Sequence, residues 1–301
     1  MSRAYWPLLL VLAAVWGASY LFIKVAVEGG LEPAPLMAAR AGIAAVLLYA
    51  YVASTRGARR AVAELRESWR QWAVIGVVGN ALPFWLVAWG ETHVDSGIAA
   101  IAQSTVPIFT ILLGLRFLPA EPLGATRWAG IIIGLVGVGV LTGAAPDHGW
   151  WAIAGTLAVV ISSLAYASGN VIGQRSVSAT AGPVLAAGAM ISAFLTLLPF
   201  GLLQLPRSAP DTDAIASLLA LALLGTVLAQ LVLYRMLRLF GGRRASLVTY
   251  LMPGFAIVYG ALILDEPVTI SALGGLVLIL AGVALGSGSL RSRVIARGTT
   301  P

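Results

Sequence analysis

The sequence predicts an all-α integral membrane protein, with ten transmembrane helices arranged as two inverted five-helix repeats around a central cavity. Composition, the number of apolar segments and a recurring motif support this prediction. Hydrophobic residues make up 59% of the 301 residues and charged residues only 10%, whereas an ordinary soluble domain carries about 25% charged residues. A chain this apolar cannot cover its exterior with polar groups, so that exterior must face lipid.

The apolar segments have the length that a membrane span requires, which is roughly 20 residues for about 30 Å of hydrocarbon. The first segment could also be a signal peptide, but it is long and leads directly into another apolar segment. The stretch 55–70 is the longest polar one and the only one with room for an amphipathic surface helix. We expect the ten spans near residues 5–27, 33–54, 71–90, 95–115, 127–143, 151–173, 183–204, 214–234, 245–264 and 270–288.

The distribution of basic residues predicts the orientation. If the N-terminus is cytoplasmic, sixteen of the 19 basic residues lie in inner segments and only Arg207 lies in an outer one, while Lys24 and Arg40 lie within spans. This is the asymmetry that the positive-inside rule describes, and it places both termini in the cytoplasm. The net charge of +7 does not indicate nucleic-acid binding, because the basic residues form no patch interleaved with aromatic residues.

Several kinds of chemistry are excluded or disfavoured. The chain has no cysteine, and its two histidines, His93 and His148, are too far apart in sequence to suggest a metal site. We therefore expect neither a metal nor a cofactor. A membrane-embedded enzyme would need a nucleophile–base pair or paired carboxylates at membrane depth, and no Asp or Glu lies at the middle of a predicted span. This absence also disfavours a central site for cationic drugs, for which Glu91 or Asp95 at the outer mouth would be the remaining partner.

A motif recurs in the two halves of the chain. The prolines are separated by 146 residues, and the Glu-Pro pairs and the glycines that follow them by 145. An odd number of helices in each half inverts the second half in the membrane, as in many secondary transporters; chance similarity between apolar helices is the alternative. We predict repeats at 1–145 and 146–290 and a short basic cytoplasmic tail at 291–301. The repeated residues are Pro107, Glu121, Pro122, Gly130 and Gly137, matched by Pro253, Glu266, Pro267, Gly275 and Gly282.

This order of motifs, together with Trp16-Gly-Ala-Ser19 in the first span and Arg40 in the second, resembles the drug/metabolite transporter superfamily. The closer resemblance is to its ten-helix EamA-type exporters, including the YddG-like aromatic amino-acid exporters. The resemblance implies a bacterial inner-membrane protein that exports small metabolites, above all aromatic or other neutral amino acids, by alternating access. Its partners would be a small-molecule substrate and the lipid bilayer. A multidrug or cationic-compound exporter is the alternative function, and a membrane-embedded enzyme is a distant one. The oligomeric state stays open, and the sequence is compatible with a monomer.

By the same resemblance, helices 1–4 and 6–9 would surround the cavity and helices 5 and 10 would pack outside it. Helices 5 and 10 are rich in glycine, which permits close approach of two helices in a membrane. The glycines concerned are Gly130, Gly134, Gly137 and Gly139 in helix 5, and Gly274, Gly275, Gly282 and Gly286 in helix 10.

Polar and aromatic side chains within the spans are the candidate substrate-binding residues, because polar groups in lipid are costly and normally face protein or a water-filled cavity. Two stripes each follow one helix face, with Ser163, Tyr166 and Asn170 on one helix. Hydrogen bonding between helices is the alternative for these stripes, as is the interfacial aromatic belt for the tryptophans. The candidate residues are Ser19, Tyr20, Asn80, Trp85, Trp89, Gln103, Ser163, Tyr166, Asn170, Gln230, Tyr234 and Tyr250.

Two further groups have positions that suggest a role. Pro83, Pro107 and Pro253 are candidate hinges, with purely structural kinks as the alternative. Arg40 and Lys24 are candidate partners for a substrate carboxylate. Arg40 could instead satisfy carbonyls of a broken helix, and Lys24 could reach the interface or pair with Glu28 at i+4.

Overall fold

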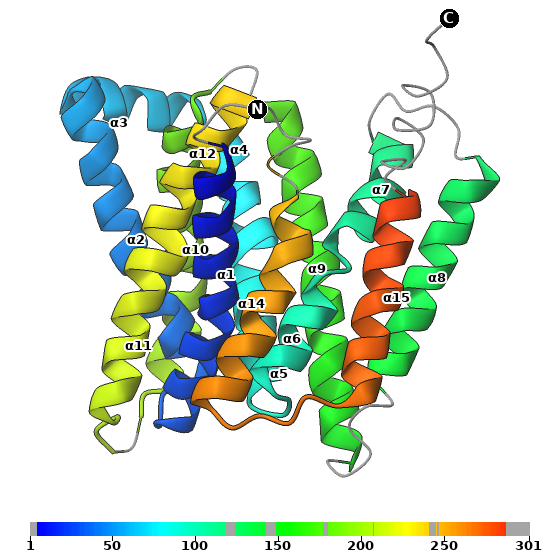
Figure 1. Ribbon diagram of the computed structural model, residues 1–301. Coiled ribbons are helices and arrows are strands. Elements are labelled where there is room, and N and C mark those ends of the chain that lie inside the picture. Colours follow the sequence, from blue (N-terminus) through cyan, green and yellow to red (C-terminus); the bar gives the residue numbers. More distant parts are fainter. Residues whose placement is uncertain are drawn as a thin grey trace, which may run out of the picture.

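The computed structural model is a bundle of helices that run roughly side by side (Figure 1), and it describes residues 5–117, 124–142, 149–176, 180–206, 208–240, 245 and 247–286. Seven helical segments are long and apolar enough to cross a membrane, and three shorter apolar helices lie at 125–141, 248–263 and 270–286. Together they correspond in order to the ten predicted spans. The predicted tail, 291–301, lies outside the described residues.

The first five spans are built from eight helical elements, because two of these spans are interrupted. Spans one, two and five are α1 (Tyr5–Glu28), α2 (Pro33–Arg56) and α8 (Ala125–Thr142). The third span combines α4 (Trp69–Gly76), the π-helical segment η1 (Val77–Ala81) and α5 (Leu82–Glu91), and the fourth combines α6 (Ser96–Gln103) and α7 (Val106–Phe117).

The remaining spans include one more interruption. Spans six, seven, nine and ten are α9 (Gly149–Ser176), α10 (Gly182–Leu203), α14 (Val248–Ile263) and α15 (Ile270–Gly286). The eighth span combines α11 (Thr212–Ala222), the π-helical segment η3 (Leu223–Leu228) and α12 (Ala229–Phe240). We call the end of the bundle where α1 begins the Tyr5 end, at the top of Figure 1, and the opposite end the Glu28 end.

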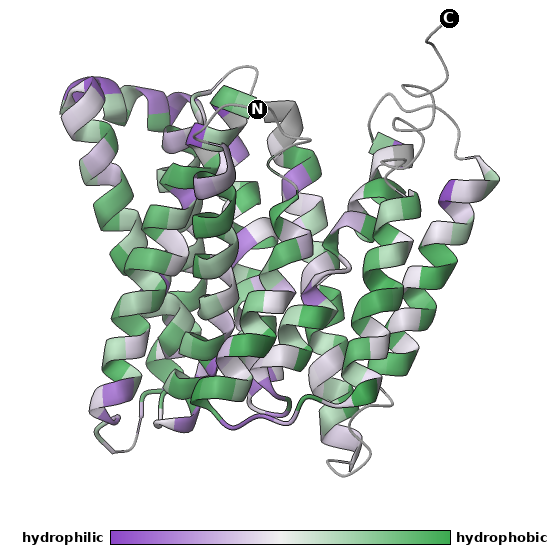
Figure 2. Cartoon of the chain, viewed as in Figure 1, coloured by the Kyte–Doolittle hydropathy of each residue, from purple (hydrophilic) through white to green (hydrophobic). Residues whose placement is uncertain are grey.

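The hydropathy of the surface fits a lipid environment. Figure 2 shows hydrophobic residues along the length of the helices and hydrophilic ones mainly toward the two ends. Large apolar side chains are exposed, among them Leu203 at 83% and Val277 at 65%. Such a surface is stable only where lipid replaces water around it.

The polar stretch between the second and third spans forms the predicted amphipathic surface helix, α3 (Ala58–Glu67). Its Ala61 and Leu65 are buried. On its polar side, Glu64 accepts hydrogen bonds from Arg56 Nη1 at 2.7 Å and from Arg60 Nε at 2.8 Å. Burial acts to raise the pKa of the Glu64 carboxyl, but the hydrogen bonds and charges of Arg60 and Arg56 outweigh it and hold that pKa below its usual value.

Helices α8 and α15 lie side by side at one edge of the bundle (Figure 1). The sequence indicated that both are suited to close packing but not that they contact each other. A Cβ at Gly282 would lie 2.5 Å from the backbone oxygen of Gly130, and one at Gly137 would lie 2.8 Å from the backbone nitrogen of Ile279. Not every glycine contributes to this contact, because a Cβ at Gly139 would meet no atom within 4 Å. Only part of the glycine pattern therefore reflects helix packing.

The two candidate hinge prolines of the repeated motif occupy different local structures. In the fourth span the helix breaks at Ser104 and Thr105, and Pro107 is the second residue of the helix that follows. Pro253 lies inside the continuous helix α14. The sequence places both prolines inside helices, and this is correct only for Pro253. Proline is tolerated in the first turn of a helix, where its missing N–H has no partner to lose.

We predict that Gly282→Val disrupts the α8–α15 contact, because its side chain would overlap backbone atoms that cannot move away. Overpacking of this kind costs about 1–3 kcal/mol or more. The yield of folded protein after detergent extraction, followed by size-exclusion chromatography and thermal unfolding, should fall several-fold. Gly139→Ala is the matched control and should behave like the unsubstituted chain. Equal behaviour of the two variants would show that close packing of α8 on α15 does not stabilise the fold.

Candidate functional site

A permanently charged side chain lies buried near the centre of the bundle. Arg40 of α2 is 7% exposed, and its Nε donates a hydrogen bond of 2.8 Å to Thr226 Oγ1 of η3. Its Cζ lies 4.0 Å from the centroid of the Phe84 ring of α5, a cation–π contact. A guanidinium stays protonated in proteins, so these contacts must compensate for its removal from water.

Two tyrosines complete this group. The Phe84 ring lies 6.4 Å from the Tyr166 ring of α9, at an interplanar angle of 57°. Arg40 interacts electrostatically with Tyr166 and with Tyr20 of α1, which is 6% exposed. We call the five residues the Arg40 cluster: Tyr20, Arg40, Phe84, Tyr166 and Thr226. The cluster joins elements from both halves of the chain.

The two π-helical segments occupy equivalent places in the two halves. In η1, Asn80 Nδ2 donates to the carbonyl oxygen of Ile75 at 3.1 Å. In η3, Thr226 Oγ1 donates to the carbonyl oxygen of Leu221, also at 3.1 Å. Both side chains reach five residues back, and the two pairs are 146 residues apart, the same offset as between Pro107 and Pro253. Interruptions of this kind are common at functional sites, and here a side chain partners a carbonyl of the interrupted turn.

Helix α1 packs closely against the third and fourth spans at the Glu28 end. At the Glu28 end, α5 and α6 both pack against α1, and α6 also packs against α14. In the part of the chain that the structure describes, α4 and α7, which continue the same spans toward the Tyr5 end, form no comparable contact with α1. Asn170 lies one turn beyond Tyr166 on the same face of α9 and is exposed.

Polar contacts close the Glu28 end. Lys24 Nζ lies 3.2 Å from Glu28 Oε1, the predicted i+4 pair, and it also donates to the carbonyl oxygens of Glu91 at 3.0 Å and Val94 at 3.1 Å. Lys24 therefore holds the end of α5 against α1. Its contacts with carbonyls were not expected from the sequence.

Glu266, from the repeated Glu-Pro motif, binds the first residues of α6. Its carboxylate accepts hydrogen bonds from the backbone N–H of Ser96 at 2.7 Å, from Ser96 Oγ at 2.8 Å and from the backbone N–H of Gly97 at 3.1 Å. A carboxylate is favourable there because the first N–H groups of a helix lack partners within the helix. The segment before α15 is thereby tied to the fourth span.

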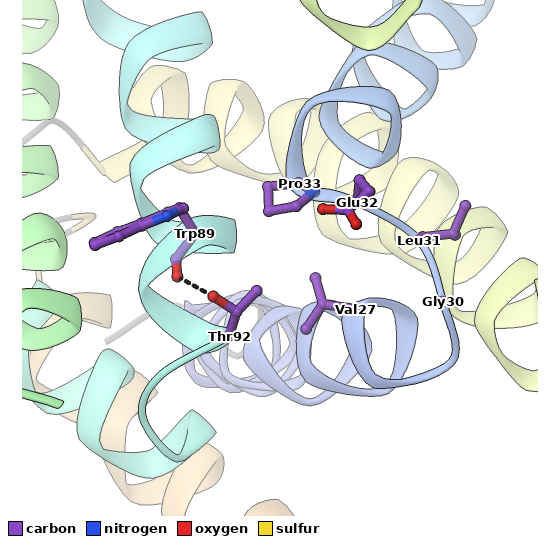
Figure 3. A pocket seen from close by; sticks show the side chains of 7 residues that line it. All are labelled: Val27, Gly30, Leu31, Glu32, Pro33, Trp89 and Thr92. Carbon is purple, nitrogen blue, oxygen red and sulfur yellow. Dashed lines mark hydrogen bonds between the residues drawn. The ribbon is translucent and has the colours of Figure 1, made fainter. Parts of the chain in front are cut away.

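A cavity of about 340 Å³ lies at the Glu28 end, between the α1–α2 turn and the end of α5. Figure 3 shows it, with the ring of Trp89 extending away from Val27 and Leu31. The Trp89 ring lies 4.5 Å from the ring of His93. Trp89 is therefore near the mouth of the Glu28 end and apart from the Arg40 cluster. The lining residues are Val27, Gly30, Leu31, Glu32, Pro33, Trp89 and Thr92.

Three candidate residues lie at helix contacts in this structure. Ser163 is fully buried and donates to the carbonyl oxygen of Val159 at 3.2 Å and to that of Ala102 at 3.4 Å. Gln103 Oε1 accepts a hydrogen bond of 2.9 Å from Ser162. Ser19 donates to the carbonyl oxygen of Val15 at 3.1 Å. The bonds of Ser163 to Ala102 and of Ser162 to Gln103 connect α9 with α6, as in the alternative interpretation, whereas the bond of Ser19 lies within α1.

The other candidates have varied surroundings. Asn80 is 8% exposed and Pro83, three residues later, is buried at the start of α5. Gln230 is half-buried. Trp85 and Tyr250 are half-buried and pack against the core. The side chain of Tyr234 lies outside the described residues. Binding of substrate by these residues remains a prediction.

Sequence reasoning missed Phe84 and did not foresee the burial of Glu91. Phe84 is one apolar residue among many in its span, so hydropathy does not distinguish it. The available signal was its position, directly after Pro83 and four residues after Asn80. Glu91 was expected in an outer segment, but the structure buries it completely. Neither position could be read from hydropathy, because both depend on which helices meet.

The profile of the EamA-like transporter family matches this chain twice, over residues 4–143 and 153–288. The chain belongs to the EamA-like transporter family. Family and relatives are transporters rather than enzymes. A probable amino-acid metabolite efflux pump of Salmonella typhimurium is 26% identical over 99% of both chains. An uncharacterized transporter of Archaeoglobus fulgidus is 26% identical over 92% of this chain and 96% of the relative.

The family assignment agrees with two further comparisons. YedA, an uncharacterized inner membrane transporter of Escherichia coli, is 28% identical to this EamA-family chain. The similarity covers 84% of this chain and 80% of YedA. A solved crystal structure superposes with a TM-score of 0.69 at 20% identity and covers 95% of this chain and 97% of its own. The second similarity concerns the fold alone.

We predict that Thr226→Val destabilises the protein, because it removes both the acceptor of Arg40 Nε and the donor to the Leu221 carbonyl. Leaving buried polar groups without partners costs about 1–3 kcal/mol, or more for a charged group. Thermal unfolding of purified protein should show a clear fall in the midpoint temperature. The matched control is Thr156→Val, since Thr156 is buried and bonds only to Ala152 of its own helix. Equal effects of the two variants would mean that the contact with Arg40 contributes little.

Proposed function

We propose that this transporter exports neutral amino acids, preferentially aromatic ones, by alternating access. The observation that carries the proposal is the Arg40 cluster, in which a buried permanent cation lies beside three aromatic rings. The names of two relatives, both probable amino-acid metabolite efflux pumps, support the same class of substrate.

The chemistry of the cluster suits such a solute. A guanidinium carries five N–H donors and can bind a carboxylate with two parallel hydrogen bonds. Arg40 uses Nε for Thr226, and its Nη1 lies 3.7 Å from Met37 Sδ. The α-carboxylate of an amino acid could therefore bind at the remaining donors. Contacts between a substrate ring and Phe84 or Tyr166 would add roughly 0.5–1.5 kcal/mol each.

We further propose that the Tyr5 end faces the cytoplasm of a bacterial inner membrane. Five arginines at the end of α2, in α3 and at the start of α4 lie at this end, and the positive-inside rule favours such residues on the cytoplasmic side. In this orientation α4 and α7, which pack less closely on α1 than α5 and α6 do, lie toward the cytoplasm, where an exported solute would enter. The five are Arg56, Arg59, Arg60, Arg66 and Arg70.

The same proposal retains two five-helix repeats, at 1–145 and 146–290. The double match to one family profile and the equivalent positions of η1 and η3 support it. Each half contributes one interrupted span to the centre, so that the Arg40 cluster lies where the two repeats would meet. Inverted repeats around a central site are a common basis for alternating access.

We predict that purified protein in liposomes carries phenylalanine, tryptophan or tyrosine better than aspartate, glutamate or lysine. Radiolabelled counterflow, with liposomes preloaded with each amino acid in turn, measures this preference. Tyr166→Leu should reduce the preference for phenylalanine over alanine by up to about tenfold, the upper end of one aromatic contact. Ser168→Ala, on the same helix with its hydroxyl bonded to Leu164, is the control and should leave the preference unchanged.

The opposite result in the same assay would contradict the proposal. If lysine or a quaternary ammonium compound competes better than phenylalanine, the central cation is not the feature that selects the substrate. The protein would then be a cationic-compound exporter, and a carboxylate rather than Arg40 would bind its substrate.

A further inference from the structure

Glu91, the last residue of α5, carries a buried carboxylate that has no hydrogen-bond partner in the described part of the chain. Its exposed fraction is 0%, and neither carboxylate oxygen has a hydrogen bond among the described residues. Side chains of this kind are rare, because an ionised carboxylate loses its hydration on burial and must regain it from protein groups. The proposed export mechanism gives Glu91 no role.

The charged groups that face Glu91 are all bound elsewhere. Lys24 and Glu28 of α1 pair with each other, and Lys24 also donates to the backbone oxygen of Glu91 rather than to its carboxylate. Arg40 of α2 binds Thr226, and Glu266, before α15, binds the N-terminus of α6. Lys24, Glu28, Arg40 and Glu266, together with Tyr20 of α1, are the titratable groups among the described residues that interact with Glu91.

The remaining neighbour of this part of the chain is α9. It packs Gly155 and Val159 against Gly90, next to Glu91, and neither residue titrates. A buried carboxylate with no hydrogen bond and no dedicated cation takes up a proton instead of remaining ionised. In the packed arrangement of the Glu28 end, Glu91 is therefore the neutral acid.

Glu91 lies where α1, α5 and α6 meet at the Glu28 end. These are the elements that must separate if that end opens. Separation would admit water to the carboxylate, and hydration favours the ionised form. Ionised Glu91 is then compatible with the open end, and neutral Glu91 with the closed one.

We propose that Glu91 is a proton-binding site that links closure of the Glu28 end to the uptake of one proton. This inference rests on the proposed alternating access. The proton comes from water at the open Glu28 end and binds one carboxylate oxygen, and opening returns it to water, so no other group changes its charge. With the Glu28 end external, acid outside the cell favours the arrangement seen here, in which α1, α5 and α6 are packed together at that end.

The test uses cysteine labelling, since the chain has no cysteine of its own. Val94→Cys places a thiol beside Glu91 at a position that is 4% exposed. Its rate of reaction with a membrane-impermeant maleimide, added outside intact cells, reports opening of the Glu28 end. Ser208→Cys, at an exposed position, corrects for the intrinsic pH dependence of maleimide chemistry and shows that this end is external.

With Glu91 present, the corrected rate should rise between about pH 5.5 and about pH 8.5, by at most about tenfold per pH unit for one proton. In the Glu91→Gln background it should be low and independent of pH. Glu28→Gln removes a neighbouring but 58% exposed carboxylate and should keep the pH dependence. Glu91→Leu is a second neutral variant. Both Glu91 variants should match the thermal stability of the unsubstituted protein, because the carboxylate forms no hydrogen bond.

Two results would overturn the proposal. One is the same pH profile with and without Glu91, including a flat profile in both. The other is loss of folded protein in both Glu91 variants, which would show that the carboxylate has a structural partner. The labelling uses no amino acid, so its outcome is independent of whether phenylalanine is the substrate.

Discussion

Burial of the Arg40 guanidinium is the constraint on which the centre of this transporter depends. A charge that cannot be removed by deprotonation must be stabilised wherever it lies in the membrane. The structure does this with a hydroxyl from η3 and a ring from α5, so α2 is linked to both halves of the chain. Tyr166 and Tyr20 interact with the guanidinium electrostatically. We propose that the same guanidinium binds a substrate carboxylate.

The π-helical segments explain how the backbone accommodates this site. Within lipid, every backbone carbonyl must find a partner inside the protein. Where η1 and η3 interrupt the regular pattern, Asn80 and Thr226 supply that partner from their side chains. Thr226 also accepts from Arg40, so one hydroxyl serves both the interrupted helix and the buried charge. Asn80, the equivalent residue of the first half, has only the first of these roles among the described contacts.

Much of the fold could be predicted from the sequence, because lipid imposes a simple rule on composition and length. The ten spans and the surface helix at 58–67 follow from apolar runs and a polar interval, and the glycine content of α8 and α15 indicates close packing without naming the partner. Local backbone choices could not be predicted in the same way. The fourth span breaks at Ser104 and Thr105, whereas the equivalent ninth span is continuous, because proline chemistry permits both outcomes.

The candidate site was predictable only in part. Polar residues within spans identified Arg40, Tyr20 and Tyr166, since such residues seldom face lipid. The same criterion also selected Ser163 and Gln103, which lie at helix contacts, because the sequence does not show which helix faces meet. Glu91 was assigned to an outer segment because it lies at the end of an apolar run, yet α5 carries it into a buried position. Burial at the end of a span depends on neighbouring helices and not on hydropathy.

The central claim is that the two ends of the bundle open alternately around the Arg40 cluster. Pulsed electron paramagnetic resonance tests it directly, with one nitroxide pair at Arg116 and Leu239 of the Tyr5 end and another at Thr92 and Val268 of the Glu28 end, all exposed positions. With phenylalanine added, the first distance should shorten and the second lengthen in the same fraction of molecules. If both distances stay fixed, or both change in the same direction, the protein does not work by alternating access around this site.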